Sequence, residues 1–258
     1  GDRWGHAVLP QEDGPELPPG EDGEKGSQRR RRLEGGYMQG GGSAHISVVD
    51  GDGNAVALTS TINTNFGAGV FSPSTGLLLN NQMDDFSSPS HHNSYGIPPS
   101  ALNHIAPGKR PLSSLSPTLV FRRPGNATAG PPPAGAPPGD LFLVLGASGG
   151  PKIITSTLQT LVAHALLGHG PFEAVARSRV HDQLLRHGVP GARYDSRDLE
   201  RSPHGRARVE LPAYARRALA RRGHDLLPDG EMGAVQAVAV DAETGRLTAV
   251  SDVRRGGG

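Results

Sequence analysis

Residues 41–50 read Gly41-Gly42-Ser43-Ala44-His45-Ile46-Ser47-Val48-Val49-Asp50, a glycine run, one small hydroxyl residue and a segment that alternates apolar and polar side chains. The turn sequence Asp50-Gly51-Asp52-Gly53-Asn54 follows, and then the apolar run Ala55-Val56-Ala57-Leu58. Two β-rich runs that are divided by such a turn sequence predict a β-hairpin. We therefore expect a strand, a tight turn and a second strand that ends near Thr61.

More strands are predicted further along the chain. Residues 76–81 have the pattern of another short buried strand, and residues 118–121 are expected to pair with residues 141–145. The Pro-rich segment between these two runs, at about 123–139, predicts a low-complexity, exposed loop.

Helices are predicted between the strands. Apolar residues recur at helical spacing over residues 153–167, and residues 213–222 predict a second, more basic helix. Another hairpin is expected near the C-terminus, from residues 234–240 and 247–250. Strand pairs at both ends with helices between them predict an α+β layered sheet, and not a helix bundle or a doubly wound fold.

The composition limits the classes of protein to which the chain can belong. Its 258 residues suffice for one substantial domain, but only 35% of them are hydrophobic, and 37 glycines and 23 prolines are present. Residues 1–42 fit this loop-rich composition and are predicted to be a disordered tail or linker. The absence of cysteine excludes disulfides, thiolate catalysis and zinc–thiolate sites.

Charge and hydropathy give little reason to expect nucleic acid or a membrane as partner. The formal net charge is +1, and the basic run of residues 29–32 contains no aromatic residue that could stack on a base. That run is interpreted as part of a solvated tether. No segment has about 18 consecutive apolar residues, and residues 1–20 lack the pattern of a signal peptide, so any anchor or export signal is expected outside this chain.

Ser43 is the first candidate for chemistry. An alcohol is a poor nucleophile until a base removes its proton, and a chain-terminal serine can use its own α-amino group, which titrates near about pH 8, as that base. This requires that the peptide bond after Gly42 breaks, and the glycines at 40–42 would permit the strained backbone that attack by Ser43 on the preceding carbonyl demands. Taken alone, such a glycine–serine segment is more often a linker.

Four motifs follow Ser43 in order and change that interpretation. They are Thr59-Ser60-Thr61-Ile62-Asn63, Asn80-Asn81-Gln82-Met83-Asp84-Asp85-Phe86-Ser87-Ser88-Pro89, Pro111-Leu112-Ser113-Ser114-Leu115-Ser116-Pro117-Thr118 and Gly146-Ala147-Ser148-Gly149-Gly150. The series resembles the small, catalytic subunit of the γ-glutamyltransferases (glutathione hydrolases), members of the N-terminal-nucleophile hydrolase superfamily. The resemblance covers about residues 42–185 and, weakly, the last thirty residues. It implies an αββα-layered fold, of which residues 43–258 would be the small-subunit portion.

The resemblance implies catalytic roles for four residues. Ser43 corresponds to the nucleophile, which attacks the γ-glutamyl amide and forms an acyl-enzyme. Thr61 corresponds to a threonine that hydrogen-bonds and positions the nucleophile. Gly149 and Gly150 fall where backbone N–H groups form the oxyanion hole, and glycine there lets the main chain approach the developing charge.

Five further residues match the positions that bind the substrate in the family. Asn63, Gln82 and Asp85 would hold the α-amino group, since a carboxylate and amide oxygens together accept ammonium protons. Ser113 and Ser114 would bind the α-carboxylate through their hydroxyls. No metal and no organic cofactor is implied.

Several of these residue types also have structural interpretations. Asp85 could cap or close a loop, and Ser113 and Ser114 could be turn hydroxyls. The glycine motif could belong to a phosphate loop, but Pro151-Lys152-Ile153 stands where such a loop has Gly-Lys-Ser/Thr. His45 and His181 are interpreted as structural, because the family nucleophile needs no side-chain base.

The chain departs from the family in two ways. The nucleophile of the family is a threonine, and serine lacks the methyl group that restricts χ1, so reduced activity is expected at Ser43. The family also makes one precursor that yields a large subunit, which supplies an arginine to the substrate α-carboxylate; residues 1–42 are too short to replace it. The alternative hypothesis is therefore a weak or inactive relative that retains the fold and γ-glutamyl binding.

The expected partners follow from the resemblance. They are a γ-glutamyl substrate such as glutathione, an acceptor amino acid, peptide or water, and a large subunit from the same precursor. The family suggests an extracytoplasmic setting, which is the cell surface, the secreted fraction or the vacuole.

Overall fold

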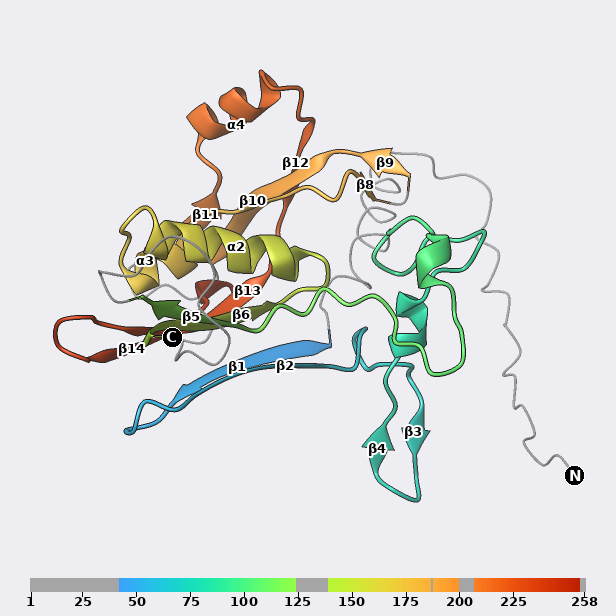
Figure 1. Cartoon of the computed structure of the whole chain (residues 1–258). Coiled ribbons are helices and arrows are strands. Elements are labelled where there is room, and N and C mark those ends of the chain that lie inside the picture. The colour runs from blue at the N-terminus through green and yellow to red at the C-terminus, as the bar shows by residue number, and fades with distance from the viewer. Residues whose placement is uncertain (1–41, 124–138, 187, 200–206, 256–258) are drawn as a thin grey trace, which may run out of the picture. The chain divides into compact units, whose positions relative to one another are not determined.

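The computed structural model describes residues 42–123, 139–186, 188–199 and 207–255 (Figure 1). The predicted tail at residues 1–42 therefore lies outside the described residues, except for Gly42, and so does the loop predicted at about 123–139, except for its ends. Among the described residues, no helix has both the length and the apolar character that crossing a membrane requires.

A four-stranded antiparallel sheet forms the centre of the fold, in the order β14-β13-β6-β5. Its strands are β5 (Thr118–Arg122), β6 (Asp140–Ser148), β13 (Ala234–Val240) and β14 (Leu247–Ser251). Side chains of the long strand β6 are almost fully buried because both faces of the sheet are covered, and Leu143, Val144 and Leu145 are at most 1% exposed. The predicted pairing of residues 118–121 with 141–145 and the predicted C-terminal hairpin are confirmed.

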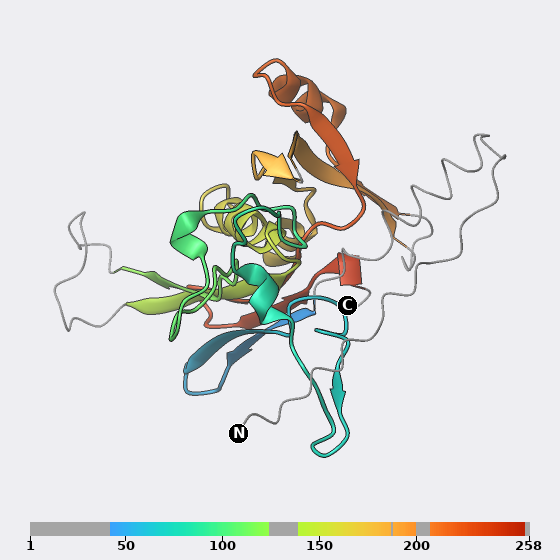
Figure 2. The same ribbon diagram turned by 90° about the vertical axis from the view of Figure 1, so that its right-hand side faces the viewer.

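The predicted N-terminal hairpin, β1 (Ser43–Val49) and β2 (Ala55–Thr61), covers one face of this sheet and lies against β6 and β13 (Figures 1 and 2). A hairpin with one face in water normally turns its apolar side chains toward the sheet and its polar ones outward, and this hairpin does the opposite. Small and polar side chains such as His45 and Ser47 point toward the sheet, whereas Ile46 and Leu58 point outward and are more than half exposed. The outer face of the hairpin is therefore apolar.

Two helices, α2 (Lys152–Ala165) and α3 (Pro171–Ala176), cover the opposite face of the sheet. The helix predicted at 153–167 is confirmed, and Leu161 of its apolar stripe packs against the buried core, but other residues of that stripe are exposed. Ile154 and Leu158 are 51% and 54% exposed, whereas Ser156 and Thr160 are buried against the sheet. Small and hydroxyl side chains let the helix approach the sheet closely.

A second sheet adjoins this layered unit, and strand β10 (Ala192–Leu199) lies within it. Strand β10 pairs with β7 (Val180–His181), β11 (Ala207–Glu210) and, in parallel, with β12 (Leu226–Asp229). Helix α4 (Ala213–Ala220) confirms the second predicted helix.

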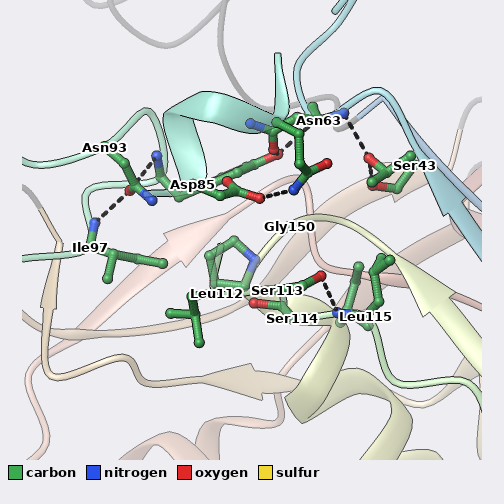
Figure 3. Close-up of a pocket in the computed structure, with 15 residues that line it drawn as sticks. Ser43, Asn63, Asp85, Asn93, Ile97, Leu112, Ser113, Ser114, Leu115 and Gly150 are labelled. Carbon is green, nitrogen blue, oxygen red and sulfur yellow. Dashed lines mark hydrogen bonds between the residues drawn. The ribbon is translucent and has the colours of Figure 1, made fainter. Parts of the chain in front are cut away.

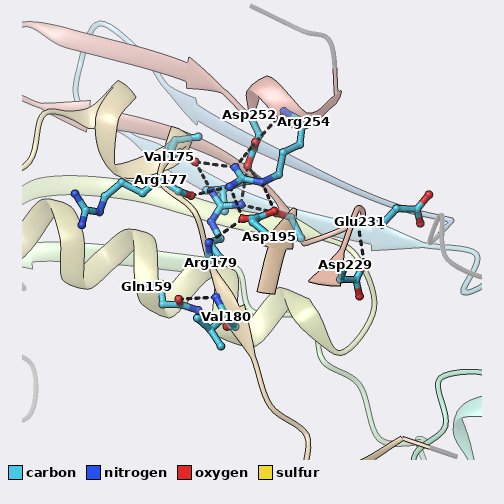
Figure 4. Close-up of polar contacts among 12 residues, drawn as sticks. Gln159, Val175, Arg177, Arg179, Val180, Asp195, Asp229, Glu231, Asp252 and Arg254 are labelled. Carbon is cyan, nitrogen blue, oxygen red and sulfur yellow. Dashed lines mark hydrogen bonds and ion pairs between the residues drawn. The ribbon is translucent and has the colours of Figure 1, made fainter. Parts of the chain in front are cut away.

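A buried network of two arginines and two aspartates ties this sheet to the C-terminal segment (Figure 4). The Arg179 guanidinium contacts Asp252 at 2.9 Å, and the Arg254 guanidinium contacts Asp195 at 2.6 Å. All four side chains are at most 1% exposed. Each buried charge has a partner of opposite sign, so removal of any one of them would leave an uncompensated charge in the interior.

The remaining elements are short and lie outside the two sheets. They are β3 (Phe71–Ser72), β4 (Leu77–Leu78), β8 (Leu185–Arg186), β9 (Val189–Pro190) and the short 3₁₀ helices η1 (Gln82–Asp85), η2 (Ala101–Asn103) and η3 (Val253–Arg255). The prediction of a buried strand at residues 76–81 is wrong. Only two of these residues are in a strand, which pairs with β3 in a small hairpin, and Leu77 is 59% exposed.

Candidate active site

Eight of the nine predicted site residues line one pocket (Figure 3). They are Ser43, Thr61, Asn63, Gln82, Asp85, Ser113, Ser114 and Gly150. Gly149, the ninth, directly precedes Gly150 in the chain. The pocket therefore brings together residues from the β1–β2 hairpin, from η1, from the segment before β5 and from the turn between β6 and α2.

Ser43 opens β1 and lies directly opposite Thr61, the last residue of β2. The Ser43 hydroxyl donates a hydrogen bond of 2.8 Å to the Thr61 Oγ1. That oxygen also accepts the Asn63 N–H at 2.8 Å, and it lies 3.4 Å from the Gly42 carbonyl oxygen, to which it donates. Thr61 thus contacts both the candidate nucleophile and the carbonyl group of the peptide bond that precedes it.

Asn63 is 2% exposed and adopts a left-handed backbone conformation with φ of 74°. Its side-chain N–H donates to the Asn81 carbonyl at 2.8 Å, and the Tyr95 hydroxyl lies 2.8 Å from the Asn63 carbonyl oxygen and 2.9 Å from its Oδ1. These contacts fix the orientation of the Asn63 amide at the pocket wall.

Asp85 supplies the carboxylate of the pocket. The Gln82 side-chain N–H donates a hydrogen bond to it. Burial, and secondly the neighbouring negative charge of Asp84, raise the pKa of Asp85 to about 6, and a hydrogen bond from Asn63 opposes this shift. A bound cation would favour the ionised form, so the site is suited to an ammonium group.

Gly149 and Gly150 form the turn between β6 and α2, with positive φ values of 130° and 61°. A Cβ atom on Gly149 would lie 2.8 Å from the Gly233 Cα, and one on Gly150 would lie 2.6 Å from a ring carbon of Tyr95. Both positions therefore require glycine. Within the described part of the chain, neither backbone N–H has an acceptor in the protein, so both can donate to an anion.

The family model described as gamma-glutamyltranspeptidase matches residues 21–258. The chain belongs to this family. The match also extends through residues 186–228, which the sequence motifs did not reach.

Relatives of known name agree with this membership. Scoloptoxin SSD14 of Scolopendra dehaani is 38% identical over 216 residues, which are 84% of this chain and 32% of that protein. Glutathione hydrolase 2 of Arabidopsis thaliana is 37% identical over 230 residues, which are 86% of this chain and 36% of that protein. This chain thus spans about a third of the length of these two relatives.

Solved structures show the same fold. A mutant of Helicobacter pylori gamma-glutamyltranspeptidase is 33% identical with a TM-score of 0.64, over 81% of this chain and 98% of that chain. The gamma-glutamyltranspeptidase of Pseudomonas nitroreducens complexed with L-DON is 38% identical with a TM-score of 0.63, over 81% of this chain and 94% of that chain. The predicted α+β architecture of the N-terminal-nucleophile hydrolases is confirmed.

The structure adds pocket residues that the sequence did not indicate. Asn93, Tyr95 and Ile97 reach the pocket from the loop after η1, and Leu112, Leu115, Pro151 and Ile153 complete its lining. Tyr95 is the one titratable side chain among these seven, and burial, followed by the charges of Asp85 and Asp84, raises its pKa to about 12. The sequence around Tyr95 has no motif or spacing that would distinguish a pocket tyrosine from an exposed one in a loop.

The two histidines near the motifs make structural contacts. His45 bonds the Thr59 hydroxyl through Nδ1 at 2.7 Å and the Ser47 hydroxyl through Nε2 at 3.0 Å, and burial lowers its pKa. His181 bonds the Thr155 hydroxyl and the Gln183 side chain, both at 3.0 Å. Neither ring has a hydrogen bond to Ser43 among the described contacts, which supports their interpretation as structural residues.

Proposed function

We propose that this protein is a γ-glutamyl transferase and hydrolase whose nucleophile, Ser43, is freed by cleavage of the Gly42–Ser43 bond. The observation that carries the proposal is the position of the Thr61 hydroxyl, which bonds both the Ser43 hydroxyl and the Gly42 carbonyl oxygen. The side chain that would attack and the carbonyl group that would be attacked are thus held by one residue, at the mouth of a pocket that carries the family motifs.

Self-cleavage would proceed by an N-to-O acyl shift. The Ser43 Oγ attacks the Gly42 carbonyl carbon, the C–N bond breaks, and the hydroxyl proton passes to the Ser43 nitrogen. Water then hydrolyses the ester, which leaves Gly42 with a carboxylate and Ser43 with a free α-amino group. That amine would be the base next to the Ser43 hydroxyl, since no histidine or lysine lines the described pocket.

The γ-glutamyl transfer would be a two-step, ping-pong reaction. The free amine of Ser43 accepts the hydroxyl proton while Oγ attacks the γ-carbonyl carbon, and the Gly149 and Gly150 N–H groups donate to the oxyanion. The leaving amine takes the proton as the acyl-enzyme forms. Water or an acceptor amine then attacks the ester and releases glutamate or a new γ-glutamyl amide.

The ends of the pocket are suited to the two charged groups of a γ-glutamyl donor such as glutathione. Asn63, Gln82 and Asp85 would surround the α-ammonium group, with the Asp85 carboxylate as an acceptor for it, and the hydroxyls of Ser113 and Ser114 would donate to the α-carboxylate. No arginine or lysine lines the described pocket, so the cation for that carboxylate would come from the rest of the protein. We propose a large subunit of the same precursor as its source.

A second candidate function rests on the serine at position 43. Without the methyl group of threonine, its hydroxyl has more accessible rotamers, and an inactive relative that binds γ-glutamyl compounds without turnover would have the same pocket.

Intact mass and N-terminal sequencing of the full-length protein separate these possibilities. A fragment that begins Ser43-Ala44-His45, together with release of p-nitroaniline from γ-glutamyl-p-nitroanilide, supports the enzyme, and Ser43→Ala should abolish both. An uncut chain under conditions in which Ser43→Thr is cut would contradict the proposal and favour the inactive relative.

A further inference from the structure

Lys152 is a buried cation that the proposed mechanism does not use. It is the first residue of α2 and directly follows Gly149, Gly150 and Pro151. Lys152 is only 7% exposed. Its ammonium group donates to the Asp229 Oδ2 at 2.7 Å and to the Glu231 carbonyl oxygen at 2.5 Å. A lysine is rarely buried to this extent unless its charge is paired.

Asp229, the partner of Lys152, has further polar contacts of its own. Asp229 ends β12, and its other carboxylate oxygen accepts the Glu231 N–H at 2.8 Å (Figure 4). Burial raises the pKa of Asp229, but the Lys152 ammonium and the hydrogen bonds that it accepts bring the net value below its ordinary range. The Arg186 guanidinium approaches the same carboxylate at 3.9 Å. Burial lowers the pKa of the Lys152 ammonium, and the charge of Asp229 opposes that shift.

Residues 229–233, which we call the 229–233 turn, also touch the glycine turn directly. A Cβ atom on Gly149 would lie 2.8 Å from the Gly233 Cα, and one on Gly233 would lie 3.1 Å from the Lys152 carbonyl oxygen. Gly233 thus fits between Gly149 and the first turn of α2. On the other side, Gly150 contacts the ring of Tyr95. The glycine turn is enclosed between these two surfaces.

We propose that the Lys152–Asp229 ion pair is a positioning device that clamps the 229–233 turn against Gly149 and so fixes the direction of the Gly149 and Gly150 N–H groups. Lys152 acts through the backbone and touches no reacting atom. The inference rests on the proposed function, because it assigns the two N–H groups to the oxyanion.

The expected effect follows from the geometry of oxyanion holes. Loss of a single donor lowers kcat by about 10²–10³-fold, and displacement without loss should cost less, so we expect Lys152→Met to lower kcat by about 10–100-fold. The KM for the donor should stay within about threefold, since an interaction made only in the transition state changes kcat and leaves ground-state binding unchanged.

Four variants of the full-length protein test the clamp. Lys152→Met removes the cation, Lys152→Arg retains it, and Lys152→Met/Asp229→Leu removes both charges so that none is left buried without a partner. Lys109→Met is the matched control, because Lys109 also donates to two carbonyl oxygens, those of Leu102 and His104, but is exposed and does not line the pocket.

Hydrogen exchange supplies a readout that does not depend on turnover. The Ile153 N–H donates to the Gly150 carbonyl oxygen at 3.0 Å, so its exchange rate reports on the glycine turn, whereas Leu143 and Leu145 in β6 report on the sheet. We expect faster exchange at Ile153 in Lys152→Met and in the double variant, unchanged exchange in β6, and rates close to wild type in Lys152→Arg and Lys109→Met.

Three outcomes decide the matter. Faster exchange confined to Ile153, together with the selective fall in kcat, supports the clamp. Exchange that is unchanged at Ile153, or that rises by the same factor in β6, overturns it, because the pair would then be irrelevant to the turn or merely structural. A wild-type protein that does not release p-nitroaniline contradicts the proposed function, and the exchange rates alone still decide whether the pair holds the turn.

Discussion

Asp85 is the residue whose environment most directly predicts a pH dependence. Its pKa is raised to about 6 by burial and then by the charge of Asp84. Only the carboxylate form can pair with an α-ammonium group, so the KM for a γ-glutamyl donor should fall as the pH rises through 6 and should be constant above about pH 7.

Steady-state kinetics with γ-glutamyl-p-nitroanilide between pH 5 and pH 8 test this prediction. Asp84→Asn removes the like charge and should move the inflection of KM to lower pH, whereas Asp85→Asn should raise KM and remove the inflection. An inflection that stays in place in Asp85→Asn would assign the titration to another group.

The raised pKa of Asp85 also makes the stability of the folded protein depend on pH. A carboxyl group whose pKa is higher in the folded protein than in the unfolded chain contributes stability that is complete below about pH 4 and is lost as the pH rises through about 6. The pocket therefore holds Asp85 at the expense of folding stability near neutral pH. In thermal denaturation, Asp85→Asn should raise Tm at pH 7.5 and leave it unchanged at pH 4.

Tyr95 offers a second test at the level of one residue. Tyr95→Phe removes the hydroxyl that bonds the carbonyl and Oδ1 of Asn63. We expect a loss of about 1 kcal/mol in the free energy of unfolding, because a buried acceptor loses its partner, and a higher KM because the Asn63 amide is less well oriented. Tyr214→Phe, at a tyrosine that is 68% exposed, is the control and should change neither quantity. An unchanged KM in Tyr95→Phe would show that Asn63 does not depend on this contact.

The elements of the fold show why a glycine is needed inside the most buried strand. The ring of His45, on the inner face of the β1–β2 hairpin, fills the space above Gly146 in β6, where a Cβ atom would lie 2.3 Å from the ring. Gly146→Ala should therefore destabilise the protein by about 1–3 kcal/mol and displace β1, which begins with Ser43.

A double-mutant cycle measures this contact. In a His45→Ala background, Gly146→Ala should cost much less, so the two effects on the free energy of unfolding should couple strongly. Gly51→Ala is the matched control, because a Cβ atom there would meet no atom within 4 Å. Additive effects of His45→Ala and Gly146→Ala would show that the hairpin does not pack on β6 through this contact.

The positions of helices and strands were easier to predict from the sequence than which of their side chains are buried. Turn residues at Asp50–Asn54 and the alternation on either side specify the first hairpin locally, which is why it was predictable. An apolar run, by contrast, shows that its side chains favour burial, but not whether this chain or another one buries them. Residues 76–81 were predicted to form a buried strand, but Leu77, Leu78 and Leu79 are exposed, and so are Ile154 and Leu158 of the predicted helix α2. The site was predictable through ordered motifs, whereas Tyr95 reaches the pocket only through the path of its loop.

At the scale of the whole molecule, exposed apolar side chains indicate a surface that another part of the protein covers. The outer face of the β1–β2 hairpin carries four side chains, Ile46, Val48, Val56 and Leu58, that are each 48–56% exposed. A sheet face of this kind is rare on a protein that works alone. This chain also spans about a third of the length of scoloptoxin SSD14 and of glutathione hydrolase 2, and no arginine or lysine lines the described pocket. We therefore expect the outer face of the hairpin to be the surface that the proposed large subunit covers.

The final prediction tests this arrangement. Lysines at two of these positions, Ile46→Lys/Leu58→Lys, should leave the fold of the described unit intact, because both side chains point away from the sheet. Burying the four apolar side chains would contribute about 1 kcal/mol each, so two buried lysines should strongly weaken the association of the two fragments after cleavage. Size-exclusion chromatography of the cleaved full-length protein should show one complex for the wild type and separated fragments for the variant.

Leu167→Lys is the matched control, because Leu167 is 62% exposed but lies just after α2, on the helix side of the sheet. It should leave the complex intact if the hairpin face is the interface. Fragments that stay together in the hairpin variant would place the interface elsewhere, and the exposed stripe of α2 would then be the next surface to test. Separation with loss of donor binding would also show that the partner fragment completes the pocket, as expected if it supplies the cation for the α-carboxylate.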